Sequence, residues 1–163
     1  MSVAAILSPE RIFIAGPGEA QVPDKAAALE RLSHLFARAS VGRGAAPTLD
    51  QDAIQQILVE RERQHSTGVG GGVAIPHGAV ESLDVHLGAL LVVTPAIPFA
   101  ASDGQPVSLV FGLLGPRGAA AQHLKLLARI ARLLRDDVAR ARLLAAGDAA
   151  DAFERVRELE RGW

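Results

Sequence analysis

A glycine-rich stretch at residues 66–78, STGVGGGVAIPHG, places a histidine directly after an apolar segment. Its glycines let the backbone bend sharply or approach a ligand, and their consecutive N–H groups can form a concavity that binds anions. We expect Val73 to Ile75 to form a short buried strand. Pro76 ends that strand because it has a fixed φ and no N–H to donate to a neighbour. His77 is then held rigidly at the strand end, as a nucleophile would be.

Transfer of a phosphoryl group through nitrogen suits such a histidine. Neutral imidazole is a nucleophile near physiological pH, and phosphoryl transfer depends mainly on positioning and on neutralising charge. An arginine can hold phosphate oxygens with its two-pronged guanidinium, and a second histidine can hydrogen-bond the phosphoryl group. We therefore predict a site of catalytic His77, His123 and Arg61 and phosphate-binding Thr67, Gly70 and Gly78.

Arg61 is expected on the inner face of a helix that begins at a capping box formed by Thr48 and Gln51. Apolar residues three and four apart give this helix a buried face, which continues to Arg61 rather than to Glu60 or Glu62. The alternative is that the arginine is a last-turn cation that complements the negative end of the helix dipole.

His123 is expected in the first turn of an apolar helix over residues 119–135, on the same face as Leu127, Ile130 and Leu134. The N-terminal end of a helix favours anions and disfavours a charged imidazolium, so a histidine there suits a site for phosphate. The alternative is a core histidine whose ring is satisfied by a neighbouring carbonyl group.

Strands and helices alternate along the chain, which predicts one α/β domain over residues 1–163 with a central mixed β-sheet flanked by helices. Buried strands are expected at 85–93 and 107–114, and an amphipathic helix capped by Asp24 is expected to run to about residue 39. Residues 1–22 are predicted to form an edge strand or an irregular cover.

Turns and further helices complete the expected fold. A Gly-Pro-Gly turn is expected at residues 16–18, and a glycine-containing loop precedes the helix that carries Arg61. Near the C-terminus we expect a helix over 138–146 and a last helix capped by Asp151 and Glu154. The other histidines, in contrast, are expected to have only local roles: His34, His65 and His86.

Composition excludes several classes of function. The chain has 17 basic and 18 acidic residues, which gives no electrostatic footprint for nucleic acid. The absence of cysteine excludes disulfides and thiolate chemistry and is compatible with a reducing cytosol. We find no secretory signal and no apolar segment long enough to span a membrane, so we expect a cytoplasmic protein without membrane insertion.

Local motifs for other chemistries are also missing. The glycines do not match the dinucleotide fingerprint, since Val73 and Ile75 stand where a third glycine is required. Neither Lys25 nor Lys125 follows a glycine, which excludes a P-loop. The sequence contains no nucleophile elbow and no zinc-protease helix. We predict neither a cofactor nor a bound metal.

The segment from Glu62 to Gly78 resembles the signature of a known family, the enzyme IIA proteins of the fructose/mannitol class of the phosphoenolpyruvate-dependent phosphotransferase system. That signature has an acidic or amide residue, six others, and then apolar-Gly-x-x-apolar-Ala-apolar-Pro-His-small, and every position is met. The resemblance implies that an HPr-like phosphocarrier protein phosphorylates His77, at Nε2, and that Arg61 and His123 occupy active-site positions.

Within this class, the sequence context looks most like the nitrogen-regulatory branch. The resemblance then implies that phosphorylation controls binding to regulatory protein targets such as potassium-transport systems or sensor kinases. A sugar-branch carrier would use the same histidine but pass phosphate to a IIB protein. A non-catalytic ligand- or metal-binding module built on His77 and His123 is a further alternative, although two histidines without a carboxylate or thiolate partner make a poor metal site.

Overall fold

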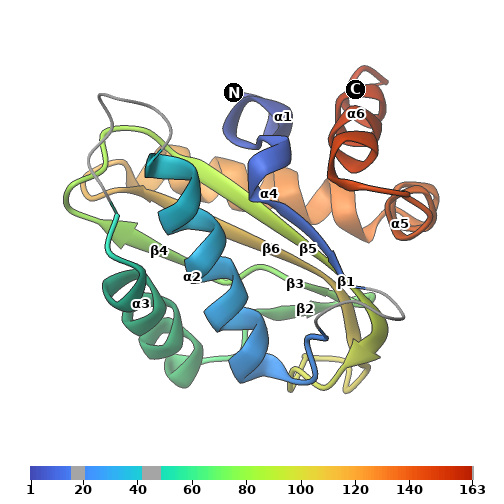
Figure 1. Cartoon of the computed structure of the whole chain (residues 1–163), viewed down its shortest axis with the longest axis horizontal. Coiled ribbons are helices and arrows are strands. Elements are labelled where there is room, and N and C mark those ends of the chain that lie inside the picture. The colour runs from blue at the N-terminus through green and yellow to red at the C-terminus, as the bar shows by residue number, and fades with distance from the viewer. Residues whose placement is uncertain (16–20, 42–48, 163) are drawn as a thin grey trace.

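A six-stranded mixed sheet lies between two layers of helices in the computed structural model of the chain (Figure 1). The structure describes residues 1–15, 21–41 and 49–162. The strands are β1 (Ile12–Ala15), β2 (Gly68–Gly70), β3 (Val73–Ala74), β4 (His77–Val80), β5 (Leu87–Ile97) and β6 (Val107–Pro116). The helices are α1 (Val3–Ile6), α2 (Lys25–Val41), α3 (Gln51–Gln64), α4 (Ala120–Arg135), α5 (Asp137–Leu144) and α6 (Ala149–Glu160), and a short 3-10 turn spans Pro9–Arg11.

Strand order in the sheet is β1-β5-β6-β3-β2, and β4 also pairs with β6. The strands β5 and β6 form a long antiparallel pair, and β2 and β3 are also antiparallel, whereas β1 runs parallel to β5 and both β3 and β4 run parallel to β6. The sheet is therefore mixed and flanked by helices, which confirms the predicted α/β fold. The edge-strand interpretation of the N-terminal segment is also confirmed, because β1 pairs with β5 at the edge of the sheet.

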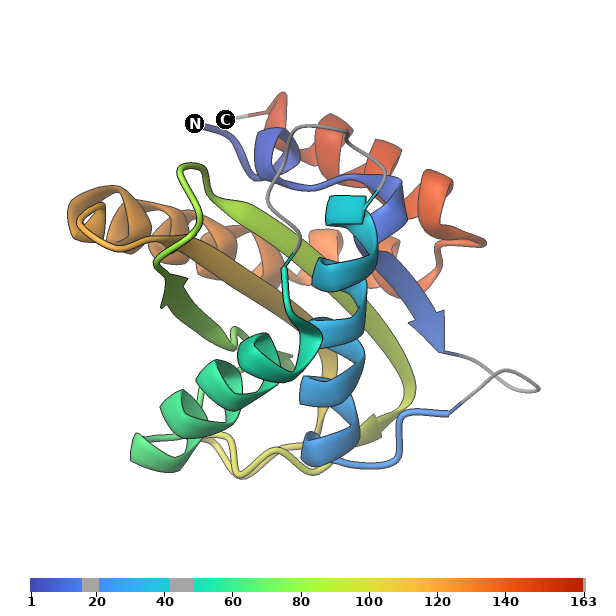
Figure 2. The same cartoon turned by 60° about the vertical axis from the view of Figure 1, so that its left-hand side comes forward.

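Each face of the sheet carries its own hydrophobic core. On one face α4, α5 and α6 pack with α1 against side chains such as Leu109, Phe111 and Leu113. On the other face α2 and α3 pack against residues that include Val110 and Leu114. Figures 1 and 2 show α2 and α3 on one side of the sheet and α4 on the other. The alternation along β6 follows from the two-residue period of a strand.

The segment from Val73 to Val80 differs from the prediction. Pairing with β6 stops only at Ile75 and Pro76 and then resumes in the same register, so that His77 begins β4 instead of ending a strand. The reason is that proline lacks only the donor: the Pro76 carbonyl still accepts a hydrogen bond from the backbone N–H of Leu113, at 2.9 Å.

The strand predicted at 85–93 also continues further than expected, to Ile97. The chain passes Pro95 through an exposed irregularity and rejoins the sheet where Ile97 pairs with Val107. A proline inside an apolar run therefore interrupts the ladder here without ending the strand, as bulges allow.

Aspartates cap four of the helices: Asp136 caps α5, and the other three are helices for which the sequence predicts a cap. Asp24 caps α2 as predicted, with its carboxylate accepting a first-turn N–H. The caps predicted for the other two helices are wrong: Asp50 caps α3 and Asp148 caps α6, each through a side-chain oxygen. Asp151 lies one turn inside α6. Thr48, expected as a cap, lies outside the described residues, as do the predicted turn at 16–18 and most of the loop before α3.

The first and last helices lie side by side because one carboxylate joins them. Glu160 of α6 accepts hydrogen bonds from the backbone N–H groups of Val3 and Ala4 at 2.7 and 2.8 Å, and it pairs with Arg129 at 3.0 Å. These contacts satisfy the unpaired N–H groups at the start of α1. Within the described ranges, no helix combines the length and the apolar character that crossing a membrane requires.

Candidate active site

Both helical layers contribute side chains to one hollow at the β4 edge of the sheet. His77 begins β4, Arg61 comes from the last turn of α3, and His123 comes from the first turn of α4. The hollow has a volume of about 420 Å³. It is lined by Arg61, His77, Gly78, Ala79, Pro116, Arg117, Gly118, Ala120, His123, Leu124 and Leu127. The fold thus brings together the three predicted catalytic residues, which lie far apart in the sequence.

The ring of His77 is fixed by a backbone carbonyl two residues earlier in the chain. Its Nδ1 lies 2.7 Å from the carbonyl oxygen of Ile75. Because a carbonyl oxygen can only accept, Nδ1 carries the proton and Nε2 is left with a lone pair. Arg61 Nε donates to that lone pair at 3.3 Å, which agrees with this tautomer.

Burial keeps this ring neutral. Desolvation lowers the pKa of His77 below 6.5, and the positive charge of Arg61 lowers it further. The hydrogen bond to Ile75 and the charge of Glu62 oppose this effect without reversing it. A neutral imidazole with an unprotonated Nε2 is the form that can act as a nucleophile.

Arg61 combines both interpretations considered for it. Its Nη1 donates to the carbonyl oxygen of His65 at 2.7 Å, just beyond the end of α3, as a last-turn cation does. Its Nε meanwhile reaches His77. The carbonyl contact fixes the guanidinium and leaves Nη2 for a further acceptor. Arg61 can therefore help to hold an anion at Nε2 of His77.

The prediction that Glu62 lies off the buried face of α3 is wrong. This side chain is buried, with 8% of its surface exposed. The chain beyond α3 returns over its last turn and covers this side chain. The carboxylate accepts hydrogen bonds from the backbone N–H of Thr67 at 3.1 and 3.2 Å and from Thr67 Oγ1 at 2.6 Å. It also pairs with Lys25 Nζ at 2.9 Å.

This bonding of Glu62 bears directly on His77. The backbone N–H of Ile75 donates to the Thr67 carbonyl at 2.9 Å, as in an antiparallel pair. The reciprocal donor, the N–H of Thr67, is taken by Glu62 instead. The Ile75 carbonyl is thereby left for Nδ1 of His77. Glu62, the acidic residue of the sequence signature, thus influences which nitrogen of His77 carries the proton. It does so through its own hydrogen bond to Thr67 and the bond from His77 to the Ile75 carbonyl.

Of the predicted phosphate-binding residues, only Gly78 lines the hollow. A side chain there would clash with Ile57, so α3 can pack this closely only against a glycine. The structure does not bring the other two to His77. The Thr67 hydroxyl donates to Glu62, and Gly70 ends β2 beside Asp103.

His123 lies at the edge of the buried face of α4. Ile130 and Leu134 are buried as predicted, but Leu126 and Leu133 are buried too, whereas Leu127 is only half-buried. The buried face of α4 is therefore rotated about the helix axis relative to the prediction. Because of this rotation His123 is half-buried beside the hollow, so it is not a core histidine.

Three histidine rings lie in a row. The ring centroids of His77 and His123 are 5.6 Å apart, and those of His123 and His86 are 5.5 Å apart. Burial and the two neighbouring imidazoles lower the pKa of His123 to about 4. His123 is therefore neutral at physiological pH in this structure.

His86, expected to have only a local role, is the site-region residue that sequence reasoning missed. It is buried, and desolvation lowers its pKa below 6.5. Its position next to His123 depends on the register of β5 against β6, because Leu87 pairs with Leu114 and so sets His86 opposite Gly115. Only a prediction of strand register could have found it.

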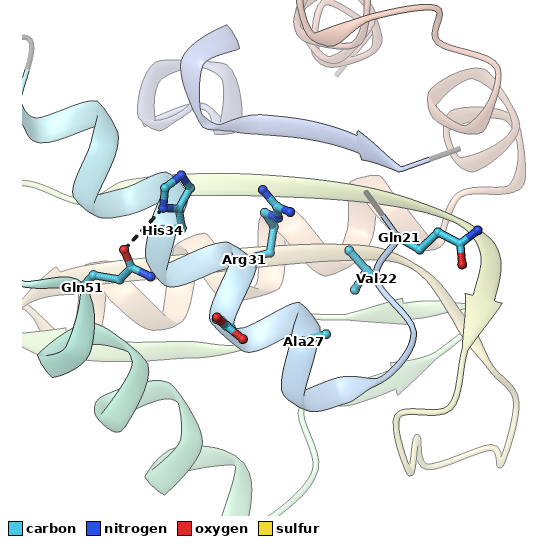
Figure 3. Close-up of a pocket in the computed structure, with 7 residues that line it drawn as sticks. Gln21, Val22, Ala27, Arg31, His34 and Gln51 are labelled. Atoms are coloured by element: carbon cyan, nitrogen blue, oxygen red, sulfur yellow. Dashed lines mark hydrogen bonds between the residues drawn. The ribbon is translucent and has the colours of Figure 1, made fainter. Parts of the chain in front are cut away.

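A second hollow, of about 280 Å³, lies over α2 (Figure 3) and shares no lining residue with the hollow at His77. In it His34 is exposed, and its Nδ1 lies 3.3 Å from Gln51 Oε1. Among the described residues no backbone carbonyl fixes this ring as Ile75 fixes His77. Residues 1–15, 21–41 and 49–162 contain no group of three histidine or acidic side chains that could hold a metal ion.

Comparison with known proteins adds evidence independent of this geometry. Residues 5–158 match the family model described as the phosphoenolpyruvate-dependent sugar phosphotransferase system, EIIA 2. The chain is 42% identical over 149 residues to a nitrogen regulatory protein of Bradyrhizobium diazoefficiens, covering 91% of this chain and 90% of that one. It is 36% identical over 157 residues to a nitrogen regulatory protein of Pseudomonas aeruginosa, covering 96% of each.

A solved structure gives the same result for the fold. The crystal structure of the nitrogen regulatory protein IIA-Ntr from Neisseria meningitidis superimposes with a TM-score of 0.80 at 30% identity. The match covers 94% of this chain and 98% of the other. The similarity therefore extends over both helical layers as well as the glycine-rich segment.

The low pKa of His123 predicts how stability depends on pH. The unfolded chain binds a proton at this histidine below pH 6.5, whereas the folded chain does so only near pH 4. Stability from this group is therefore present above pH 6.5 and is lost as the pH falls towards 4. In His123→Gln, the free energy of unfolding measured in urea should fall less between pH 7 and pH 5 than in the wild type. His34→Gln, at an exposed histidine, serves as the control, and equal slopes in all three proteins would contradict the pKa.

Proposed function

The chain belongs to the EIIA 2 family of the phosphoenolpyruvate-dependent sugar phosphotransferase system, and we propose that it carries a phosphoryl group on Nε2 of His77. The donor is an HPr-like phosphocarrier protein in the cytoplasm. The phosphorylated and unphosphorylated forms then bind different regulatory targets. In this sense the protein is a phosphoryl-transfer component that works as a nitrogen-branch regulator.

The observation that carries this proposal is the hydrogen bond from Nδ1 of His77 to the Ile75 carbonyl. It selects the tautomer whose lone pair is on Nε2 and points the nucleophile at the hollow. As Nε2 bonds to phosphorus, the ring gains positive charge, and the carbonyl stabilises the remaining N–H.

The transfer step needs no cofactor. The Nε2 lone pair forms the new N–P bond while the bond between phosphorus and the donor protein breaks, and the electron pair of that bond stays with the donor. Arg61 turns its Nε–H from Nε2 to the phosphoryl oxygens, where Arg117 at the wall of the hollow adds positive charge. Ala120 places the positive end of the α4 dipole on the same hollow.

The names of the most similar relatives support the nitrogen branch. Three proteins named as nitrogen regulatory proteins match this chain over nearly their whole length. They come from Bradyrhizobium diazoefficiens, Pseudomonas aeruginosa and Neisseria meningitidis. Under this assignment the phosphorylated protein retains its phosphoryl group when it is mixed with a IIB protein. Rapid transfer to IIB would favour the sugar branch instead.

Phosphorylation at His77 can be tested by intact-mass spectrometry. After incubation with phosphoenolpyruvate, enzyme I and a phosphocarrier, the wild type should gain one acid-labile phosphoryl group, and His77→Ala should gain none. His65→Ala, which removes an exposed histidine outside the hollow, should be phosphorylated like the wild type. A phosphoryl group on His77→Ala would overturn the proposal.

Arg61 should control the rate of this transfer. In Arg61→Ala the initial rate of phosphorylation should fall by about 10- to 100-fold, the range expected for the loss of a hydrogen bond to a charged group. Arg63→Ala, two residues further along α3 and exposed, is the matched control and should keep the wild-type rate. Equal rates in the two variants would remove Arg61 from the site.

A further inference from the structure

His86 has a buried ring nitrogen without a partner. The residue is only 6% exposed, and its Nε2 has no hydrogen bond to any described residue. An unpaired polar atom in such a place is destabilising, because it has lost its hydrogen bond to water without gaining another. The chain therefore keeps a destabilising polar group next to its candidate active site.

The sheet places this nitrogen beside His123. In the antiparallel register of β5 and β6, His86 stands opposite Gly115, on the face of the sheet that α4 covers. A Cβ on Gly115 would clash with the His86 ring and would lie 3.1 Å from Nδ1 of His123. The glycine thus opens the space in which the two imidazoles meet, with His123 presenting Nδ1 to that side.

His123 has a tautomer that the rest of the described structure does not set. No described backbone or side-chain group hydrogen-bonds either of its ring nitrogens, in contrast to Nδ1 of His77. To donate to a phosphoryl oxygen from Nε2, a neutral His123 must have its lone pair on Nδ1. Nε2 of His86 is the buried group placed to enforce this, because a Cβ on Gly115 would lie 2.5 Å from it and 3.1 Å from Nδ1 of His123.

We propose that His86 is a positioning residue whose Nε2–H donates to Nδ1 of His123, so that His123 carries its proton on Nε2 and presents it to a phosphoryl group on His77. The role of His123 towards phosphate rests on the function proposed above. The tautomer itself does not, because it is a property of the resting protein. No proton is transferred in this arrangement, and both rings remain neutral.

The experiment compares His86→Leu and His86→Gln with the wild type. Leucine has a similar volume but cannot donate, whereas glutamine keeps an N–H donor. Long-range ¹H–¹⁵N correlation spectra of the unphosphorylated proteins report the tautomer of His123. The wild type and His86→Gln should have the proton on Nε2, and His86→Leu should show a mixture of both tautomers.

Phosphorylation rates and stability separate positioning from packing. The initial rate should fall by about three- to tenfold in His86→Leu, the factor expected for the loss of one neutral hydrogen bond, and should be largely restored in His86→Gln. The rate should follow the tautomer of His123, and not the free energy of unfolding, across the three proteins, because the proposed hydrogen bond acts through the position of one proton. A loss of rate in His86→Leu with the tautomer of His123 unchanged is the behaviour of a merely structural histidine and would contradict the proposal.

Different results decide the role of His86 and the proposed phosphocarrier function. A wild-type His123 protonated on Nδ1, or an unchanged tautomer in His86→Leu, would overturn the role of His86. If His86→Leu does not fold, the wild-type spectrum and the His86→Gln variant still decide the matter. Absence of phosphorylation in the wild type would instead overturn the phosphocarrier function and leave the tautomer result standing.

Discussion

The hydrogen bond between Nδ1 of His77 and the Ile75 carbonyl is the interaction on which the site depends. It exists because another partner of that carbonyl is held elsewhere. The N–H of Thr67, which would complete the strand pair, donates to Glu62 instead. A buried carboxylate, itself neutralised by Lys25, thereby influences which ring nitrogen of a histidine on another element carries the lone pair.

The layered architecture explains why the other groups converge on this point. β6 lies at the centre of the sheet, with β4 and β5 on either side of it. Glycines allow close approach on both faces: Gly78 admits Ile57 of α3, and Gly115 admits the rings of His86 and His123. An arginine from one helical layer and a histidine from the other can therefore reach the same edge of the sheet.

Sequence patterns predicted the parts of this site that are local in the chain. The Gly-rich segment before His77 and the α/β alternation followed from residue types alone. The burial of Glu62 did not, because it depends on how the chain after α3 folds back, which helical periodicity does not contain. The contact of His86 with His123 depends on strand register, and the rotated buried face of α4 depends on its packing angle. Thr67 and Gly70 were expected to bind phosphate because they lie near His77 in the sequence. In the fold they contact Glu62 and Asp103 instead of lying beside His77.

Because the Ile75 carbonyl holds the proton on Nδ1, Nε2 of His77 is the nitrogen expected to accept the phosphoryl group. The most direct measurement is the ³¹P and ¹⁵N NMR spectrum of the phosphorylated protein, labelled with ¹⁵N at histidine, which identifies the ring nitrogen bonded to phosphorus. Phosphorus should couple to Nε2 of His77, and Nδ1 should be protonated. Phosphorus bonded to Nδ1, or to another histidine, would show that the Ile75 carbonyl does not select the acceptor nitrogen.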